Sequence, residues 1–599
     1  MLQESASMET QQEQTPSLED CLKLLKGERD EQRLAGLLLV TKFCKGDDHS
    51  SLRRVYDAVG HLFLDRLLKT GMRKGTVTSG GDNNRDAYLQ LSVTVLAAFC
   101  RVPEIASLED MVLKIPLILE VMSTGSGSSV LEECYEFIYL VSTASGNGIM
   151  RFYESGGMKI LASQISSLQD GSHLMEISMK LVQLTLSRMP LDIIMKDYLS
   201  ELSVIVAVIA RQFAVLHNSL KFEALHLLSA ILSSKDSAPL LNALHLLPND
   251  SWSHNIRIGI VAILQNRVAP AERLQALMLA ESIISTSGEG WLISPMSKHS
   301  EQDTSPADMC LLLVLEQSRV EVAVLLNELA YLKYEAPKDT STTTEAILLK
   351  QRNVAVAYSL IEKIIKLISR VDENDGNLID EGTLTKVIRQ LNETIGVILE
   401  YLEDAKERGQ KKGDDLLASV RITGSYLAEA PLACKEKVRE LLGFMLSVEG
   451  EDEQRPFYSV CFLLPMLCQI TMKTEGCKAL ASCGGLNAKD EVQIMLEESA
   501  IVNILKALVY WSENTGDTSS RIMASSICAL MFDYSSEESL LNHPDFNHST
   551  LSSLYQLIAG CLVLFGQDNK ADMDLLEIVA AGYSRWAHRY PHINAVVKT

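Results

Sequence analysis

The chain has 599 residues, beyond the size at which single hydrophobic cores stop growing, so we expect several domains or one elongated stack. Hydrophobic residues make up 47% and charged residues 22% of the sequence, a balance that is typical of folded proteins and argues against extensive disorder. The formal net charge of −22 disfavours nucleic-acid binding and broad adsorption to anionic lipid, because both need a basic surface.

Local patterns in the first sixty residues predict short helices joined by turns. Residues 1–16 are polar and slightly acidic, and we expect a disordered tail and no secretory signal. Residues 17–20 resemble a capping box and predict a helix over about 18–27. Further helices are predicted over about 30–46 and 50–60. Helices of this length with short connections form helical hairpins.

Helical periodicity dominates the rest of the chain. In residues 354–370 and 384–402, apolar residues recur every three or four positions, as in a helix that buries one stripe. We find no comparable alternating stretch and no βαβ rhythm. The sequence therefore predicts an all-α fold.

Two similar glycine turns indicate repetition. Residues 154–161 contain Gly156-Gly157, and residues 481–486 contain Gly484-Gly485; each pair is placed to end one helix and open the next, as at an armadillo repeat boundary. A period of about 40 to 47 residues gives about a dozen units over this length. The predicted fold class is an armadillo/HEAT-like α-solenoid, a superhelix of the ARM type.

Polar breaks divide the predicted stack. They lie at residues 71–85, 294–305, 335–344 and 406–415, the last a charged turn. The break with Pro337 and a threonine run is the best candidate for a seam. We therefore expect a tail (1–16), an N-terminal α-solenoid (17–335), a polar linker (336–347) and a C-terminal continuation of the α-solenoid (348–599).

Neither a membrane span nor a disulfide framework is expected. Residues 456–472 are apolar but contain Pro465 and Gln469 and are too short, and residues 546–567 are polar in their first half. Both are predicted to be buried helices. The twelve cysteines are scattered and include no CxxC pair, which predicts reduced, mostly buried residues in a cytoplasmic protein.

An acidic segment at residues 372–381 invites comparison with a calcium-binding loop. With Gly376 at loop position 6, Val371 and Gly382 occupy positions 1 and 12, which need an oxygen ligand and a bidentate Glu. The register that starts at Asp372 also loses essential ligands. The segment is therefore predicted to be a turn between helices.

Other kinds of chemistry lack their sequence patterns. His543 and His548 are spaced like zinc ligands around Pro544, but no cysteine pair stands near them, and His217 and His226 belong to a helical segment. The sequence contains no GxxxxGK[ST], no GxGxxG after a strand and no GxSxG. We predict no cofactor, no metal and no enzymatic activity.

Basic residues cluster near the N-terminus of this acidic chain. They are Arg53, Arg54, Arg66, Lys69, Arg73 and Lys74. One hypothesis is a docking site for an acidic peptide, a phosphorylated segment or an anionic lipid headgroup. The favoured interpretation is a solvated helix face that balances Asp47, Asp48 and Asp57.

An ordered series of short motifs resembles the neurochondrin family over residues 18–335. The motifs lie at residues 35–42, 56–60, 66–68, 96–100, 103–106, 114–116, 221–223, 256–259, 288–291 and 320–322. The resemblance implies an armadillo-type helical fold, a cytoplasmic location, and scaffolding of receptor and kinase signalling, linked in animals to neurite outgrowth. It offers no catalytic motif.

The leading hypothesis is a non-enzymatic scaffold or adaptor. A stack of hairpins presents a long surface for protein partners, which by the resemblance are receptor tails, kinases or other signalling proteins. The alternative is a membrane-peripheral regulator that anionic lipid or receptor tails recruit through the basic cluster. No nucleic acid and no transmembrane segment are expected.

Overall fold

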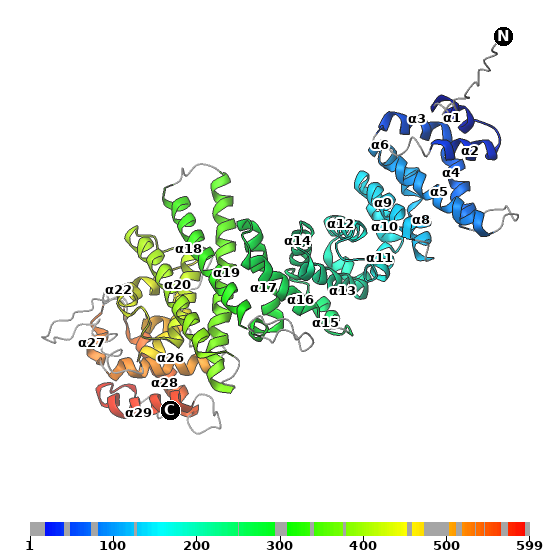
Figure 1. Cartoon of the computed structure of the whole chain (residues 1–599). Helices are drawn as coiled ribbons and strands as arrows, with labels where there is room; N and C mark the ends of the chain where they lie inside the picture. The colour runs from blue at the N-terminus through cyan, green and yellow to red at the C-terminus, as the bar shows by residue number, and fades with distance from the viewer. Residues whose placement is uncertain are drawn as a thin grey trace, which may run out of the picture. The chain divides into compact units, whose positions relative to one another are not determined.

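The computed structural model describes most of the chain. The described residues are 18–40, 48–72, 82–124, 128–248, 251–293, 308–335, 341–374, 379–451, 458–471, 502, 504–510, 518–533, 535–543, 546–564 and 573–593. Their regular structure is helical, and they contain no strand beyond one isolated bridge between Lys412 and Glu449. The chain divides into two compact units, residues 1–259 and 260–599, and most of their helices are labelled in Figure 1.

The first unit begins with the helices that the sequence predicts. Its helices are α1 (Leu18–Leu25), α2 (Asp30–Val40), α3 (His49–Val59), α4 (His61–Gly71), α5 (Asp82–Cys100), α6 (Pro103–Ala106), α7 (Glu109–Val112), α8 (Ile115–Ser123), α9 (Ser128–Ala144), α10 (Gly146–Glu154), α11 (Gly157–Ile165), α12 (His173–Arg188), α13 (Leu191–Val215), α14 (Leu220–Leu232), α15 (Ala238–His245) and the first part of α16 (Trp252–Gln265). The predicted helices over 18–27, 30–46 and 50–60 correspond to α1, α2 and α3, although residues 41–47 lie outside the described part.

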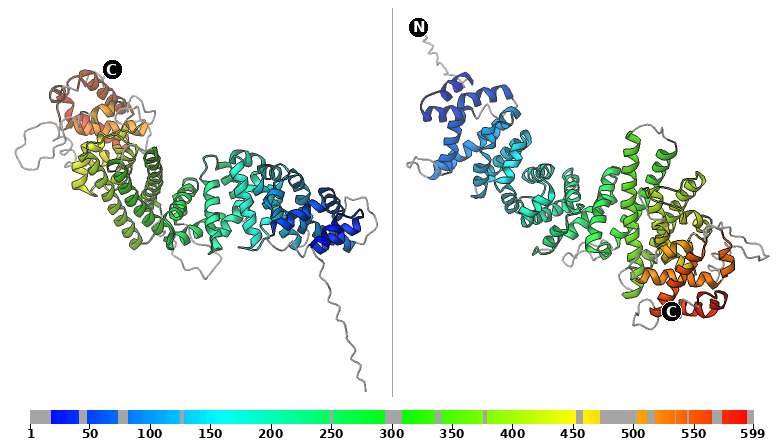
Figure 2. Two further views of the ribbon diagram at one scale, coloured as in Figure 1. Left: turned by 90° about the horizontal axis from the view of Figure 1, so that it is seen from above. Right: turned by 180° about the vertical axis from the view of Figure 1, so that it is seen from behind.

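Helices of the first unit pack on near neighbours in the chain. α5 contacts α4 and α9, α9 contacts α12, and α12 contacts α14. The colour gradient of Figure 2 follows this succession. Because each helix buries its apolar stripe against helices close in sequence, this is the α-solenoid that the sequence predicts.

The Gly156-Gly157 turn is present as predicted. α10 ends at Glu154, Gly156 adopts the left-handed conformation with φ +79°, and α11 begins at Gly157. A Cβ atom at Gly157 would lie 2.3 Å from the ring of Phe152, so a larger residue would require this ring to shift. The corresponding glycines at 484–485 lie outside the described residues.

The second unit contains the longest helices, α18, α19 and α20. Its helices in the described residues are α17 (Pro270–Ser287), η1 (Glu289–Leu292), α18 (Met309–Tyr334), α19 (Ser341–Asn374), α20 (Glu381–Glu407), α21 (Asp414–Glu429), α22 (Lys435–Leu446), α23 (Tyr458–Thr471), α26 (Thr518–Asp533), α27 (Glu537–Leu541), α28 (His548–Leu564), α29 (Met573–Trp586) and η3 (Ala587–Arg589). The periodic segments 354–370 and 384–402 lie within α19 and α20. The predicted turn at 406–415 is present between α20 and α21.

Alternate helices of the second unit form two rows. α17, α19, α21, α23 and α26 contact one another in that order, and α18, α20 and α22 form the second row. Most of the predicted apolar stripe of α20 is buried, but Ile388 is 41% exposed. α19 begins at Ser341, inside the predicted linker 336–347, and packs along α18. A seam at this linker stays a prediction.

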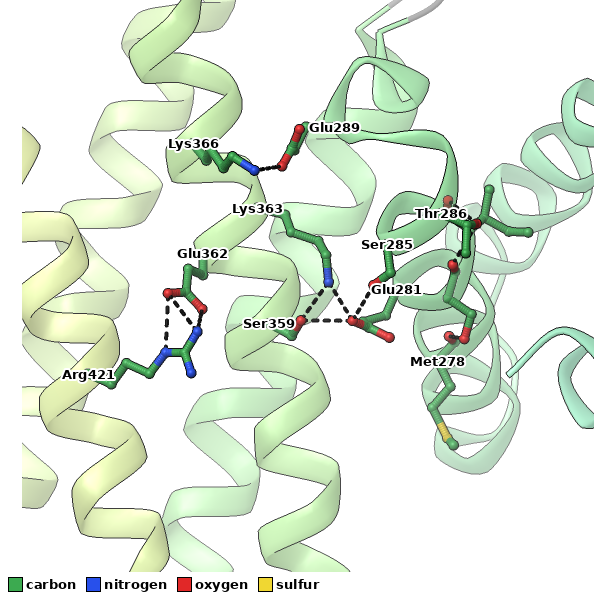
Figure 3. A network of polar contacts seen from close by, with 12 residues as sticks. Met278, Glu281, Ser285, Thr286, Glu289, Ser359, Glu362, Lys363, Lys366 and Arg421 are labelled. Atoms are coloured by element: carbon green, nitrogen blue, oxygen red, sulfur yellow. Dashed lines mark hydrogen bonds and ion pairs between the residues drawn. The ribbon is translucent and has the colours of Figure 1, made fainter. Parts of the chain in front are cut away.

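Polar side chains cross-link α17, α19 and α21 (Figure 3). Glu281 accepts hydrogen bonds from the Lys363 ammonium at 2.5 Å and the Ser359 hydroxyl at 2.8 Å. Burial raises the pKa of Glu281, but the bonds from Lys363 and Ser359 outweigh it, so the pKa is lowered. Arg421 on α21 holds Glu362 on α19 with a closest N···O distance of 2.9 Å. These contacts fix the register of the three helices.

The two predicted buried helices near the C-terminus are α23 and α28. Among the helices of the described residues, none has the length and apolar character that crossing a membrane requires. Of the nine cysteines in the same residues, seven are buried, and Cys434 and Cys461 are partly exposed. The cysteines therefore serve mainly as small apolar core residues, as the sequence predicts.

Candidate functional site

A pocket of about 570 Å³ lies between α18, α19 and α20 of the second unit. The last turns of α18 and α20 and the first turns of α19 form its walls. Its lining residues are Asn327, Glu328, Ala330, Tyr331, Leu332, Tyr334, Glu335, Ala346, Lys350, Asp404 and Arg408. Both rows of the second unit therefore contribute to the pocket.

A buried polar network joins the four helices beside this pocket. Asp415, in the first turn of α21, has a fully buried side chain and lies 2.6 Å from the Lys333 ammonium of α18. Gln351 of α19 donates to the same carboxylate at 2.9 Å, and the Tyr401 hydroxyl of α20 donates to its second oxygen. Lys333, Gln351 and Tyr401 each come from a helix that lines the pocket, so the network fixes the pocket walls.

The electrostatics of the network follow from burial and charge. Burial raises the pKa of Asp415, but the Lys333 ammonium and the bonds to it outweigh burial, and the pKa is lowered. Burial and the Asp415 charge raise the pKa of Tyr401. Burial also raises the pKa of Tyr334 in the pocket wall, and the charges of Asp415 and Asp404 add to this effect. The network therefore consists of the Lys333–Asp415 ion pair and neighbouring tyrosine hydroxyls that keep their protons.

The cations of the pocket wall have partners within it. Lys350 forms an ion pair with Glu328. The Arg408 guanidinium lies 4.4 Å from the centre of the Tyr334 ring, a distance typical of cation–π contacts. Glu335 and Asp404 are exposed and form no ion pair with any residue that the structure describes. With three carboxylates and two cations, the lining has a net charge of −1 and is weakly acidic.

An exposed stripe on α18 leads into the pocket. It consists of Val320, Val324, Asn327, Tyr331 and Glu335, spaced as one face of a helix. Val320 is 36%, Val324 47% and Tyr331 57% exposed. On α19, Leu349 is 56% exposed and lies between the pocket residues Ala346 and Lys350. Large apolar side chains that face solvent beside a pocket are typical of contact surfaces.

Comparison with known proteins places this chain in a family. The model of the neurochondrin family matches residues 12–570. The chain belongs to the neurochondrin family. The match extends well beyond residue 335, where the motifs recognisable in the sequence end, and it includes the pocket and the Asp415 network.

The relatives of this neurochondrin-family chain extend beyond the regions that align with it. Neurochondrin of Xenopus laevis is 25% identical over 508 residues, which is 78% of this chain and 64% of that protein. Human neurochondrin is 27% identical over 442 residues, 72% of this chain and 53% of that protein. The Drosophila melanogaster homolog is 23% identical over 498 residues, 77% of this chain and 62% of the homolog.

Comparison with solved structures gives matches of low TM-score and low sequence identity. The crystal structure of Uso1-2 has a TM-score of 0.31 at 11% identity and covers 94% of this chain and 92% of that chain. A structure of importin beta has a TM-score of 0.26 at 10% identity, with coverage of 97% and 75%.

The predicted basic cluster of this neurochondrin-family chain lies on α3 and α4. Arg53 pairs with Asp57 at 3.6 Å, Arg54 pairs with Glu19, and Arg66 lies 2.9 Å from Asp30. Lys69 is exposed on α4, and Arg73 and Lys74 lie outside the described residues. Each of these three arginines thus has an acidic partner, and of the carboxylates named from the sequence only Asp57 is among the partners. The role of the cluster stays a prediction.

The other sequence candidates lie at or between helix ends, except His226, which lies inside α14 as predicted. His217 lies between α13 and α14 and not in a helix, which corrects the prediction. Asp380, from the acidic segment 372–381, caps α20, because its side chain accepts a hydrogen bond from the Thr383 amide at 2.8 Å. Residues 375–378 of that segment lie outside the described part. His548 begins α28, and His543 follows α27. Among described residues, no cluster of three potential metal ligands occurs.

The pocket itself was not anticipated from the sequence. Its residues come from segments around positions 330, 348 and 406, and no local spacing connects them. Apolar residues occupy most sides of α18, so the sequence does not mark Tyr331 as a surface residue. Only the packing of α18, α19 and α20 shows that the three segments surround one pocket.

Proposed function

We propose that this chain is a non-enzymatic scaffold of the neurochondrin family that binds protein partners through exposed faces of its α-solenoid. The observation that carries the proposal is the exposed stripe of α18 beside the acidic pocket. A helix inside a folded unit ordinarily turns its apolar residues inward. Here Val324 and Tyr331 face solvent, and covering them with a partner removes apolar surface from water.

Buried charged side chains hold helices of this chain together, which supports a structural role for them. Lys114 is 2% exposed and pairs with Asp65 at 2.9 Å and Asp110 at 2.6 Å. Lys221 is 6% exposed and donates to main-chain carbonyls, and Lys333 pairs with Asp415. Each of these groups joins one helix to another, which is a stabilising role. We therefore assign no catalytic centre to the residues that the structure describes.

The finer role that we propose comes from the family. By the resemblance, the partners are receptor tails, kinases or other signalling proteins, and the location is cytoplasmic. The chain aligns with about half to two thirds of the length of the relatives it matches. Activities of the full-length relatives are therefore proposals for this chain.

Affinity purification with quantitative mass spectrometry tests the scaffold function. The wild type and the variant Val324→Glu/Tyr331→Glu are compared at equal expression, with Leu62→Glu as a control at a 63% exposed leucine of the first unit. We expect a set of proteins that the wild type and the control retain and the stripe variant loses. Equal recovery by all three forms would contradict partner binding at this stripe.

A further inference from the structure

We propose that the pocket receives a lysine or arginine side chain from a basic amphipathic helix of a protein partner, whose apolar residues lie along the α18 stripe. This inference rests on the proposed scaffold function and specifies the chemistry of the partner. The stripe is the set Val320, Val324, Asn327, Tyr331 and Glu335, and the pocket is the cavity between α18, α19 and α20.

The charge of the pocket favours a cationic guest. Its own cations are engaged, because Lys350 pairs with Glu328 and Arg408 lies over the Tyr334 ring. Glu335 and Asp404 are exposed at the pocket and form no ion pair with a residue in the described ranges. The lining holds three carboxylates, Glu328, Glu335 and Asp404, and two cations, so its net charge is −1. One bound ammonium or guanidinium group would balance this charge, whereas an anionic headgroup or a phosphorylated segment would add to it and be repelled.

The tyrosines of the pocket provide two further contacts for a cation. The Tyr331 ring is 57% exposed and can face a positive charge through its π system. The Tyr334 hydroxyl oxygen is buried and has no hydrogen-bond partner among the residues that the structure describes. Burial raises the pKa of Tyr334, and the charges of Asp415 and Asp404 add to this effect. The hydroxyl is therefore neutral, and its oxygen can accept a hydrogen bond from a donor that enters the pocket.

The form of the stripe favours a helical partner. Its residues recur at intervals of four, three, four and four positions along α18. Fifteen steps at about 1.5 Å per residue give a contact length of about 22 Å. Side chains three and four positions apart on a partner helix match this spacing, as in helix-in-groove recognition. A volume of about 570 Å³ lies within the range of sites that enclose small ligands or side chains.

Model peptides test the charge preference directly. The probe is a fluorescein-labelled helical peptide of about 16 residues with leucines on one face and lysines on the other, and its counterpart carries glutamates in place of the lysines. Fluorescence anisotropy at physiological salt measures binding to the wild type and to Glu335→Lys/Asp404→Lys. We expect the lysine peptide to bind the wild type and to lose about tenfold or more in affinity on charge reversal.

A control variant separates the effect of the pocket charges from the effect of the net charge of the protein. Glu104 and Glu109 are exposed on the first unit, and Glu104→Lys/Glu109→Lys raises the net charge as much as the pocket variant does. We expect this control to keep the wild-type affinity within about twofold. Tyr334→Phe, which removes only the hydroxyl, is expected to weaken the lysine peptide several-fold. Circular dichroism and thermal unfolding confirm that all variants fold.

Three results would overturn the inference. The first is equal loss of the lysine peptide in the pocket and control variants, which would assign binding to the overall acidic charge. The second is unchanged binding in the pocket variant, and the third is tighter wild-type binding of the glutamate peptide. In each case the scaffold proposal stands as long as Val324→Glu/Tyr331→Glu still loses partners in affinity purification, so the two proposals fail separately.

Discussion

Lys333 and Asp415 are 82 residues apart in the chain, yet the lysine ammonium lies 2.6 Å from a carboxylate oxygen of the aspartate. The aspartate side chain is fully buried, and that of the lysine is 9% exposed. In such surroundings neither charge is well hydrated, so each is stabilised mainly by its attraction to the other. The pair joins α18 to α21 and supports the walls of the candidate pocket.

Asp415→Asn is expected to destabilise the second unit by about 3 to 5 kcal/mol, because the Lys333 ammonium then stays buried without a counter-charge. Thermal or urea unfolding measures the change. Glu345→Gln, an exposed site on α19, serves as the control and is expected to stay within about 0.5 kcal/mol of wild type. A stability loss below about 1 kcal/mol for Asp415→Asn would mean that the network contributes little.

The same pair predicts a response to acid. The pKa of Asp415 is lowered in the folded state, so the folded carboxylate releases its proton more readily than the unfolded one. Its stabilising contribution is complete above the ordinary aspartate pKa and is lost as the pH falls through the lowered value. The stability gap between wild type and Asp415→Asn should therefore narrow as the pH falls below about 4. A constant gap across this window would refute the assignment.

Gly157→Ala is expected to destabilise the first unit by about 1 to 3 kcal/mol, because its Cβ atom would lie 2.3 Å from the Phe152 ring. Gly146→Ala provides the matched control, since it also opens a helix and a Cβ atom there meets nothing within 4 Å. Urea unfolding of both variants separates crowding from helix propensity. Equal stability of the two variants would show that Phe152 moves aside at no cost.

The sequence predicts features that local interactions determine, but not those that depend on contacts between distant segments. The end of α10, the turn at Gly156-Gly157 and the periodic segments of α19 and α20 are encoded locally, and the structure has them where the pattern predicts. Ile388 continues the apolar spacing of α20 but is 41% exposed. Periodicity alone does not show how wide a stripe the neighbouring helices cover.

The candidate pocket could not be predicted, because its parts are distant in sequence. Asp415 lies in a segment that the sequence marks only as a charged turn. Its partners Lys333, Gln351 and Tyr401 are ordinary residues of three separate helices. Pairing them requires the register of α18, α19, α20 and α21, which long-range packing determines. By contrast, the basic cluster is evident in sequence, but its acidic partners Glu19 and Asp30 become evident only in the fold.

Anionic liposomes are expected to leave the chain in the supernatant. Arg53, Arg54 and Arg66 already pair with carboxylates, so little positive potential remains to attract a negative membrane surface. Co-sedimentation of the wild type and of Arg53→Glu/Arg54→Glu/Lys69→Glu with vesicles rich in phosphatidylserine measures this. If the wild type pellets and the triple variant does not, the alternative of membrane recruitment gains support.

Lys221 at the start of α14 gives a prediction in the alkaline range. Its ammonium donates to the carbonyls of Phe213 at 2.7 Å and Leu216 at 3.2 Å, at the C-terminal end of α13, where carbonyls lack partners within the helix. Lys221→Met leaves these carbonyls buried, and we expect a loss of about 1 to 3 kcal/mol at pH 7 by urea unfolding.

The pH dependence of that loss has a definite sign. Burial lowers the pKa of Lys221 to about 8, whereas an unfolded lysine titrates near about 10.4. Between these values the unfolded state binds more protons than the folded state, so wild-type stability rises with pH through this window. The variant lacks this titration. The stability gap between wild type and Lys221→Met should therefore widen from pH 7.5 to pH 10, and a gap that narrows would show that the buried ammonium is stabilised in its charged form.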